Sequence, residues 1–441
     1  MIQFRSLIGH HLQQGTFSRN VLTLAGSVAL GQGLTVLATP ILTRIYSVAD
    51  FGHLQAYLSV LLFILVVVAG RYELAIVLPE DEQAAADLTV LCLGLTLVTS
   101  ILAGLVIWWL SWQSWMQTTF AGVKSFLWFM PISILGAGCY AVLCQWTLRQ
   151  KNYAQVGRSK IFQGMGMVTT QVILGKCFSA GFFGLLLGDA VGRVSGTWSF
   201  TRTAWARHSG LFRRTGWSGI ATVAHRYRQF PQISAISALI NSAGFAVPPL
   251  LIAAWYSSQV LGWYAMTDRV MCVPTALIGA AISQVYTVDA ARLANTDLAG
   301  LRALFFRTIR RLAWLGVLPF LLLFLFGEPV FTYAFGAAWS EAGRYARLLA
   351  VMQYVGFVVW PVIPTLNLLE RQSWQCGWDI GRMVLTLGAI ELAHLMGWPA
   401  RVAVAAYGCA LLVGYVMHPI ISLMAISQRM RSTGKVALNN I

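Results

Sequence analysis

The sequence predicts an all-α polytopic membrane protein with about twelve transmembrane helices, arranged as two parallel six-helix lobes around a central cavity. Three observations predict it: the composition, a series of apolar segments and an internal repeat. Of 441 residues, 57% are hydrophobic and 10% are charged, whereas soluble domains have about 25% charged residues. The net charge of +16 would suggest nucleic acid for a soluble chain, but Lys and Arg collect in the cytoplasmic loops of membrane proteins. We therefore expect the lipid bilayer, and no nucleic acid, as a partner.

Apolar segments long enough, or nearly long enough, to cross a bilayer follow one another along the whole chain. A window of about 19 residues identifies twelve of them. In order, they lie at residues 21–43, 52–78, 85–110, 125–148, 161–178, 181–201, 230–255, 259–286, 312–327, 343–368, 372–395 and 400–427. The fifth and the ninth are the shortest. Residues 1–20, before the first of these segments, lack an apolar core and a small-residue cleavage site. We therefore expect the first span, and no cleaved signal peptide, to anchor the chain.

The positive charges predict the orientation of these segments. Most Lys and Arg of the loops follow spans four, six and eight or lie in the tail: Arg149, Lys151, Arg158, Lys160, Arg202, Arg207, Arg213, Arg214, Arg226, Arg228, Arg292, Arg302, Arg307, Arg310, Arg311, Arg429, Arg431 and Lys435. The loops on the other side hold little more than Arg44, Lys124 and Lys176. By the positive-inside rule, the rich loops and both termini are cytoplasmic.

An internal repeat divides the chain into halves. A shift of 210 residues places Tyr46 and Ser47 on Tyr256 and Ser257, and Gly52 on Gly262. Six spans in each half give the halves the same orientation, as in transporters built from parallel repeats. We therefore expect lobes at residues 1–208 and 209–441, joined by an Arg-rich cytoplasmic linker at about 202–228.

Glycines recur at every fourth position of the sixth apolar segment. A spacing of four places them on one face of a helix, where small residues let a neighbouring helix approach closely. We assign helix packing to these four residues: Gly184, Gly188, Gly192 and Gly196.

Four apolar segments contain an arginine with an acid within four residues. The pairs are Arg71 with Glu73, Asp189 with Arg193, Asp268 with Arg269, and Asp379 with Arg382. Spacings of three and four place two side chains on one helical face. We therefore interpret Asp189, Arg193, Asp379 and Arg382 as structural ion pairs. Spacings of one and two place the two side chains on different faces of a helix. They predict that Glu73 and Asp268 point away from their arginines.

Arg71 and Arg269 are then the candidate cavity-facing cations. Ionisable groups inside a membrane usually face a bundle interior or a water-filled pathway. The planar guanidinium offers a fork of donors that suits phosphate oxygens. We assign Arg71 and Arg269 to substrate binding, and Glu73 and Asp268 to coupling or gating.

Signatures of an enzyme are absent from the sequence. It contains no GxxxxGK[ST] phosphate loop and no HExxH or CxxC set for zinc. The seven cysteines form no CxxC pair and lie mostly in apolar runs, as small buried hydrophobic residues do. We expect no cofactor, no metal and no catalytic residues, although missing motifs do not exclude an intramembrane transferase.

Several stretches in order along the chain are similar to one family of membrane proteins. They are LTRIYSVADFG at 42–52, GRYELAIVLP at 70–79, RYRQFPQ at 226–232, VPPLLIAAWYSSQVLGWYAMTDRVMCVP at 247–274, IGAAISQVY at 278–286 and NLLERQSWQCGWDIGR at 367–382. With them the chain resembles the O-antigen and exopolysaccharide flippases. These form the polysaccharide transporter branch of the multidrug/oligosaccharidyl-lipid/polysaccharide exporter superfamily.

The resemblance implies a function and a location. Such flippases use alternating access to move an undecaprenyl-pyrophosphate-linked oligosaccharide from the cytoplasmic to the outer leaflet of the bacterial inner membrane. The product serves O-antigen, capsule or exopolysaccharide synthesis, together with polymerase and chain-length proteins, and a proton or sodium gradient is the expected energy source. Matching motifs transfer candidate roles to Arg71 in GRYE and to Asp268 and Arg269 in YAMTDR. The twelve spans lack the two additional C-terminal helices of some lipid-linked peptidoglycan precursor flippases, which disfavours that branch.

Two other functions stay open at this point. A drug/cation antiporter of the same superfamily would have more acids than bases in its cavity, whereas the membrane charges here are balanced or slightly basic. A membrane-embedded glycan polymerase or ligase would need a large outer loop with catalytic Arg or His, and the predicted outer loops are short.

Overall fold

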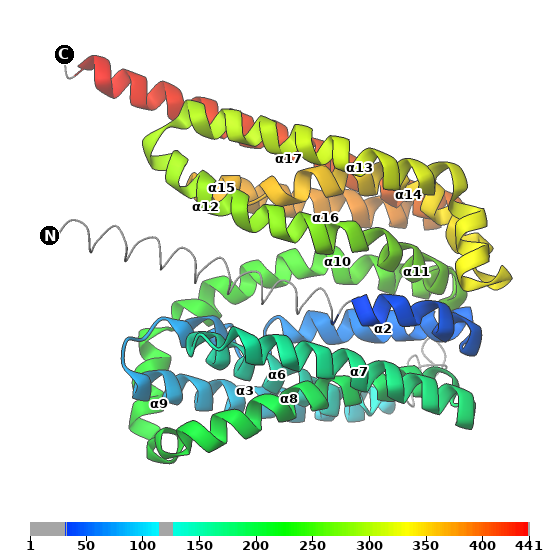
Figure 1. Ribbon diagram of the computed structural model, residues 1–441, viewed down its shortest axis with the longest axis horizontal. Helices are drawn as coiled ribbons and strands as arrows, with labels where there is room; N and C mark the ends of the chain where they lie inside the picture. The colour runs from blue at the N-terminus through cyan, green and yellow to red at the C-terminus, as the bar shows by residue number, and fades with distance from the viewer. Residues whose placement is uncertain (1–30, 32, 114–126, 440–441) are drawn as a thin grey trace, which may run out of the picture. The chain divides into compact units, whose positions relative to one another are not determined.

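The computed structural model describes residues 31, 33–113 and 127–439 (Figure 1). Every regular element within these residues is a helix. The described parts of the predicted spans fall mainly on helical residues, with the first represented by Gly33–Ile45, but the α-helix of the second span ends at Leu65. Residues 21–30 of the first span and 125–126 of the fourth lie outside the described residues. The protein is therefore a multi-pass, all-α membrane protein, as predicted.

Contacts along the chain divide it into two units. Unit 1 comprises Met1–Ser47 and Tyr57–Leu239, and unit 2 comprises Val48–Ala56 and Ile240–Ile441. The helices from α3 to α9 belong to unit 1: α3 (Glu82–Ser111), α6 (Met130–Arg149), α7 (Tyr153–Phe178), α8 (Gly181–Arg214) and α9 (Trp217–Arg226). α2 (Val48–Leu65) is shared between the units, and so is α10 (Ala235–Trp255), which follows the π-helical turn η2 (Phe230–Ser234).

The remaining helices belong to unit 2. They are α11 (Ser258–Pro274), α12 (Ala280–Thr296), α13 (Leu298–Phe335), α14 (Ser340–Val359), α15 (Thr365–Leu368), α16 (Gln372–Leu395) and α17 (Ala400–Asn439). Short turns of other helix types join several of them: η3 (Thr275–Gly279), η4 (Ala337–Trp339) and η5 (Trp360–Val362).

Side-chain oxygens cap several helix starts. Asp81 accepts hydrogen bonds from the backbone N–H groups of Gln83 and Ala84 at the start of α3. Ser257 accepts one from Val260 at the start of α11, at 3.1 Å. Asp297 does the same for α13. Because the first N–H groups of a helix have no partner within it, these residues determine where each span begins.

Among the described residues, eight helical stretches are long and apolar enough to cross a membrane by length and composition. The predicted spans missing from those eight are Gly33–Ile45, α7, α8 and α16. The last three carry several charged residues each. They still pack closely inside the units, and in unit 1 α7 and α8 run side by side (Figure 1).

The glycine face of α8 explains its close contact with α7. A Cβ atom on Gly188 would lie 2.2 Å from Cγ of Gln171, and one on Gly192 would lie 2.8 Å from the Gln163 carbonyl oxygen. On Gly184 it would lie 2.3 Å from the Tyr46 hydroxyl. Larger residues at these positions would force the helices apart.

The boundary between the units differs from the predicted lobes of 1–208 and 209–441. The linker region packs on unit 1, because Tyr72 Oη donates to the Ala224 carbonyl oxygen at 3.0 Å and Gln83 Nε2 donates to that of Leu211 at 3.3 Å. Unit 1 therefore extends to Leu239. The charge pattern predicts a loop here, but α9 forms a short helix against α3.

The repeat is visible in a helix crossing inside unit 2. A Cβ atom on Gly52 of α2 would lie 1.7 Å from the Ser258 carbonyl oxygen, and one on Gly262 of α11 would lie 2.0 Å from that of Val48. The 210-residue shift relates Gly52 to Gly262 and Val48 to Ser258. Equivalent residues of the two halves therefore meet each other reciprocally at this crossing.

Candidate functional site

The segment GRYELAIVLP does not continue the second span. α2 ends at Leu65, Gly70 and Arg71 have φ values of 59° and 63°, and Tyr72–Val77 form the 3-10 helix η1. The prediction of one span at 52–78 is therefore wrong in its second part. The 18 residues of α2 already cover about 27 Å at 1.5 Å each, close to the thickness of a bilayer core.

Arg149, at the end of α6, holds this irregular segment in place. Its guanidinium donates to four backbone carbonyl oxygens, those of Ile76, Pro79, Glu80 and Asp81. Backbone carbonyls outside a regular helix need such partners. The sequence suggested only a loop charge for Arg149, because its partners lie about seventy residues earlier in the chain.

Arg71 and Glu73 form a strained and incompletely satisfied pair. Arg71 Nη1 lies 3.9 Å from Glu73 Oε1, so the prediction that the acid points away from its arginine is wrong. That prediction assumed helical spacing, whereas Arg71 has a left-handed backbone that a non-glycine residue seldom adopts. Arg71 Nε and Glu73 Oε2 are buried and lack a hydrogen-bond partner in the described part of the chain.

The protonation of Glu73 depends on its burial. The side chain is almost inaccessible, at 8% exposure. Burial raises the pKa of this carboxyl above its ordinary value, and the Arg71 guanidinium and a backbone hydrogen bond only partly oppose the shift. Glu73 is therefore easier to protonate than a surface glutamate, which suits the coupling role expected for it.

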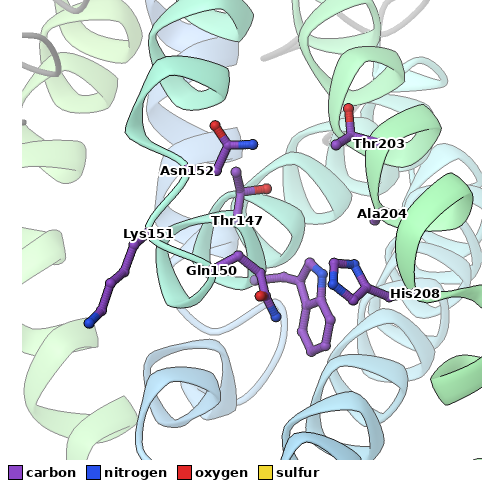
Figure 2. Close-up of a pocket in the computed structure, with 8 residues that line it drawn as sticks. Thr147, Gln150, Lys151, Asn152, Thr203, Ala204 and His208 are labelled. Carbon is purple, nitrogen blue, oxygen red and sulfur yellow. The ribbon is translucent and has the colours of Figure 1, made fainter.

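A pocket lies beside Arg149, where the connection between α6 and α7 faces α8 (Figure 2). Its volume is about 420 Å³, and it is lined by Trp146, Thr147, Gln150, Lys151, Asn152, Thr203, Ala204 and His208. Three features of the backbone shape it. Asn152 caps α7, Lys151 has a φ of 53°, and α8 is kinked at His208. This pocket cannot be predicted from the sequence, because residues distant in the chain form it.

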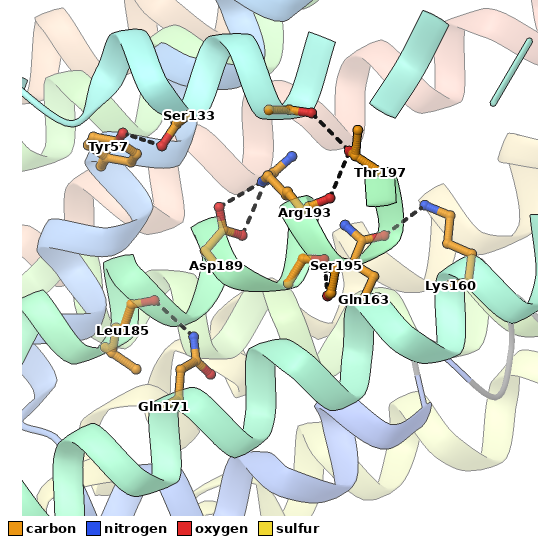
Figure 3. A network of polar contacts seen from close by, with 12 residues as sticks. Tyr57, Ser133, Lys160, Gln163, Gln171, Leu185, Asp189, Arg193, Ser195 and Thr197 are labelled. Carbon is orange, nitrogen blue, oxygen red and sulfur yellow. Dashed lines mark hydrogen bonds and ion pairs between the residues drawn. The ribbon is translucent and has the colours of Figure 1, made fainter. Parts of the chain in front are cut away.

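Asp189 and Arg193 form a close ion pair within unit 1 (Figure 3). Arg193 Nε lies 2.7 Å from Asp189 Oδ2, and Nη2 lies 3.3 Å from Oδ1. Two parallel contacts of this kind are the strongest form of an arginine–carboxylate pair. Near them Tyr57 Oη donates to Ser133 Oγ at 2.8 Å. The i,i+4 spacing therefore produces the pair that the sequence predicts.

Arg382 is buried in a different way. Its guanidinium carbon lies 4.2 Å from the ring centre of Phe245 and 5.2 Å from that of Trp378. The predicted contact with Asp379 is present but long, at 3.7 Å, and Nη2 donates to Asn241 Oδ1 at 3.4 Å. Nε and Nη1 have no hydrogen-bond partner among the described residues. Its side chain is only 1% exposed, so aromatic faces supply much of its surroundings.

Two glycines make room for the Arg382 side chain. A Cβ atom on Gly244 would lie 3.2 Å from its Nη2, and one on Gly414 would lie 3.1 Å from its Cγ. Its acid partner is itself linked onward, since Gln375 Nε2 donates to Asp379 Oδ2 and Gln375 Oε1 lies 3.2 Å from Nε2 of the buried His418. The sequence indicated the acid and the base here but none of these neighbours.

Asp268 and Arg269 lie on α11 in unit 2, whereas Arg71 and Glu73 lie in unit 1. Gln353 Nε2 of α14 donates to Asp268 Oδ1 at 3.1 Å, and Cys272 Sγ approaches the same oxygen at 3.5 Å. Neutral groups thus surround a carboxyl inside a membrane span. Such a group is a candidate for proton or ion coupling, because a carboxyl inside a membrane span is energetically costly when charged and is usually part of an ion or proton pathway.

The described residues contain no donor set of the kind that holds a metal ion. Within them, no three His, Cys, Asp or Glu side chains are grouped so that they could hold an ion.

Solved structures show which fold the chain adopts. It is similar to an inward-facing multidrug resistance transporter of the MATE family and the MOP superfamily, with a TM-score of 0.73 and 14% identity over 91% of this chain and 96% of that one. A second neighbour is a MOP superfamily transporter from Pyrococcus furiosus, with a TM-score of 0.60 and 13% identity over 92% and 95% of the two chains. The chain has the fold of MOP superfamily transporters.

The sequence comparison defines the family. The family described as Polysaccharide biosynthesis protein matches residues 41–344, which is more than half of the chain. The chain belongs to this family, so the resemblance found in the sequence motifs is confirmed. A curated relative is the succinoglycan biosynthesis transport protein ExoT of Rhizobium meliloti (strain 1021), 23% identical over 87% of this chain and 75% of the relative.

Proposed function

We propose that the protein is a flippase for a lipid-linked glycan. It moves an undecaprenyl-pyrophosphate-linked oligosaccharide repeat unit from the cytoplasmic to the outer leaflet of the bacterial inner membrane, by alternating access. Both termini are then cytoplasmic, and polymerase and chain-length proteins of the same pathway act on the product. The role is transport rather than catalysis.

The observation that carries this proposal is the family match over residues 41–344. It is supported by the transporter fold and by a relative whose name describes succinoglycan transport. A pyrophosphate headgroup is an anion that must cross a low-dielectric region, and guanidinium groups are the side chains best suited to bind it there. Two arginines of its helices have poorly exposed side chains, Arg193 at 16% and Arg382 at 1%.

Arg71 and Arg269 are the arginines that we propose for headgroup binding. Arg71 has a donor nitrogen, Nε, without a hydrogen-bond partner in the part of the chain that the structure describes, and its contact with Glu73 is long. A ligand phosphate would satisfy this donor at little cost to existing contacts. Arg269 follows Asp268 on α11 and lies in a separate motif that resembles the family, YAMTDR.

A deletion strain tests the proposal directly. Loss of the gene should stop surface polysaccharide production and cause lipid-linked repeat units to accumulate inside the cell. Arg71→Ala and Arg269→Ala should fail to restore export while the protein still inserts, and Arg71→Lys should restore part of it. Intact surface polysaccharide in the deletion strain, without accumulation, would refute the function. Full export by both alanine variants would refute the site.

A drug/cation antiporter is the second candidate. The structural neighbours include a multidrug resistance transporter, and Asp268 is a membrane carboxyl contacted by the neutral groups of Gln353 and Cys272. Such a carboxyl could exchange protons or sodium for a cationic substrate. Drug susceptibility separates the two candidates, because an antiporter deletion should sensitise cells to cationic drugs and leave the polysaccharide unchanged.

The same carboxyl serves the flippase proposal as the coupling group. A proton or sodium gradient then drives transport, with Asp268 and Glu73 as the residues that titrate. Asp268→Asn should abolish gradient-dependent accumulation in vesicles but leave binding of the lipid-linked substrate intact.

A further inference from the structure

Two residues that line the pocket between the α6–α7 connection and α8 carry buried polar atoms without a hydrogen-bond partner among the residues that the structure describes. Trp146 is only 1% exposed, and its Nε1–H has no hydrogen-bond partner among the described residues. The same holds for Nδ1 of His208, whose ring stands at 82° to the Trp146 ring with 5.5 Å between centres. A buried donor without a partner is costly. Both residues line the pocket, so a ligand there could supply the missing partners.

The two threonines of the pocket present acceptors to it. Thr147 Oγ1 donates to the Leu143 carbonyl oxygen at 2.7 Å, and Thr203 Oγ1 donates to that of Ser199 at 3.1 Å. Since each hydroxyl has a single proton, both oxygens can only accept a hydrogen bond from a ligand. A ligand that reaches these two side chains must therefore carry donors.

Other lining residues supply donors. The Asn152 Oδ1 atom accepts from the Gln155 backbone N–H at 3.2 Å as the cap of α7, which leaves its amide N–H groups available. Gln150 offers both a donor and an acceptor. Figure 2 shows Thr147, Gln150 and Asn152 facing Thr203 and His208 of α8 across the pocket, whereas the Lys151 side chain extends away.

The mixture of donors and acceptors identifies the chemistry of the ligand. A phosphate or carboxylate only accepts hydrogen bonds and would face the lone pairs of both threonines. A cation would lack an acid, because none of the eight lining residues is acidic. A sugar hydroxyl donates and accepts at once, and one ring carries several. The cavity of about 420 Å³ lies within the range of small-molecule sites.

We propose that this pocket binds a neutral sugar residue through its hydroxyl groups. The proposal rests on the proposed function, because a lipid-linked glycan supplies such sugars on the side where the α6–α7 connection is expected to lie. Trp146 donates from its indole N–H, Asn152 from its amide, and Thr147 and Thr203 accept. The pocket then binds a sugar of the glycan, while Arg71 and Arg269 bind the pyrophosphate.

Binding of simple sugars to the whole protein tests the pocket without any transport assay. The full chain is placed in lipid nanodiscs, and saturation-transfer NMR measures its contact with the methyl glycosides of common neutral hexoses. Trp146→Phe keeps the ring and removes only the N–H, and Thr203→Val keeps the shape and removes the acceptor. Each should weaken binding about 2- to 10-fold, the equivalent of one neutral hydrogen bond. Trp109→Phe, on a residue that is 59% exposed, is the matched control and should bind normally.

A second set of ligands distinguishes the possible sources and the alternative chemistry. If the pocket reads the carrier's glycan, the two variants should weaken binding of the lipid-linked repeat unit but not of undecaprenyl pyrophosphate alone. If only free methyl glycosides respond, the ligand is a free sugar and the pocket still binds sugar. Weaker binding of inorganic pyrophosphate by the variants, or no sugar contact with the wild-type protein, would overturn the proposal. Failure of the flippase function would appear separately, as normal surface polysaccharide in the deletion strain.

Discussion

Arg193 in unit 1 and Arg382 in unit 2 follow the same sequence rule but have different surroundings. Each lies in an apolar helix with an aspartate one turn earlier. Arg193 meets Asp189 through two contacts, the shorter at 2.7 Å. Arg382 meets Asp379 through one long contact of 3.7 Å and lies against the rings of Phe245 and Trp378 instead.

The difference teaches what a buried charge pair in a membrane helix can mean. Asp189 and Arg193 neutralise each other, so their pair is complete without any ligand. Arg382 keeps two nitrogens without partners among the described residues, and its charge is balanced by aromatic faces and a distant carboxylate. A completed pair stabilises a helix contact, whereas an incomplete one retains capacity to bind or to move.

Removing the acid of the complete pair should have the largest effect. Asp189→Ala leaves the Arg193 charge buried without its partner, which costs about 3–5 kcal/mol in comparable buried pairs. We expect a sharp fall in the amount of folded protein in the membrane and in its melting temperature. Abundance by immunoblot and thermal unfolding in detergent measure both. Asp379→Ala should cost clearly less, and equal losses at the two sites would contradict the comparison.

The double variant Asp189→Leu with Arg193→Met is the control for this prediction. Replacing a whole buried pair by apolar residues is often neutral or stabilising. It should therefore recover most of the stability lost in Asp189→Ala. If the double variant were as unstable as Asp189→Ala, the site would require the ion pair itself and not only electrical neutrality.

The aromatic contact of Arg382 should have a smaller effect. Phe245→Leu removes the ring 4.2 Å from the guanidinium, and a cation–π contact of this kind is worth about 0.5–2 kcal/mol. Phe324→Leu is a matched control, because the two rings are 46% and 45% exposed. Thermal unfolding should separate the two variants. An equal fall in melting temperature in both variants would show that the contact of Phe245 with Arg382 adds no stability.

The pair of Arg71 and Glu73 should give the smallest effect, and one that depends on pH. Burial raises the pKa of the Glu73 carboxyl, so the folded protein binds this proton more tightly than the unfolded chain does. Stability is then lost as pH rises through the folded-state pKa. Glu73→Gln cannot ionise, and its melting temperature should exceed that of the wild type by a margin that grows with pH. Glu80→Gln, on an exposed acid of the same segment, should show no such growth.

Hydropathy alone predicts most of this fold. Apart from the second half of 52–78, the described parts of the apolar segments fall mainly on helices, because burial in lipid requires long apolar stretches with internally satisfied backbones. The break after Leu65 was not predicted, since residues 66–69 remain apolar and only Gly70 indicates a turn. A left-handed Arg71 cannot be inferred from its residue type, which disfavours that backbone.

The surroundings of the side chains were harder to predict from the sequence than the positions of the helices. Spacing predicts the contact of Asp189 with Arg193, because both are on one helix. It cannot predict that Phe245 and Gly414 reach Arg382, or that Arg149 holds the segment around Pro79, because these contacts join distant parts of the chain. The sugar pocket was missed for the same reason, since Trp146 and His208 are brought together only by the packing of α6 on α8.

The reciprocal crossing of α2 and α11 places two glycines under one steric constraint. Residues related by the 210-residue shift meet each other at Gly52 and Gly262, which is the pattern of a twofold interface between identical chains. Because each glycine lets the same two helices approach closely, a bulky residue at either position should be as harmful as at both.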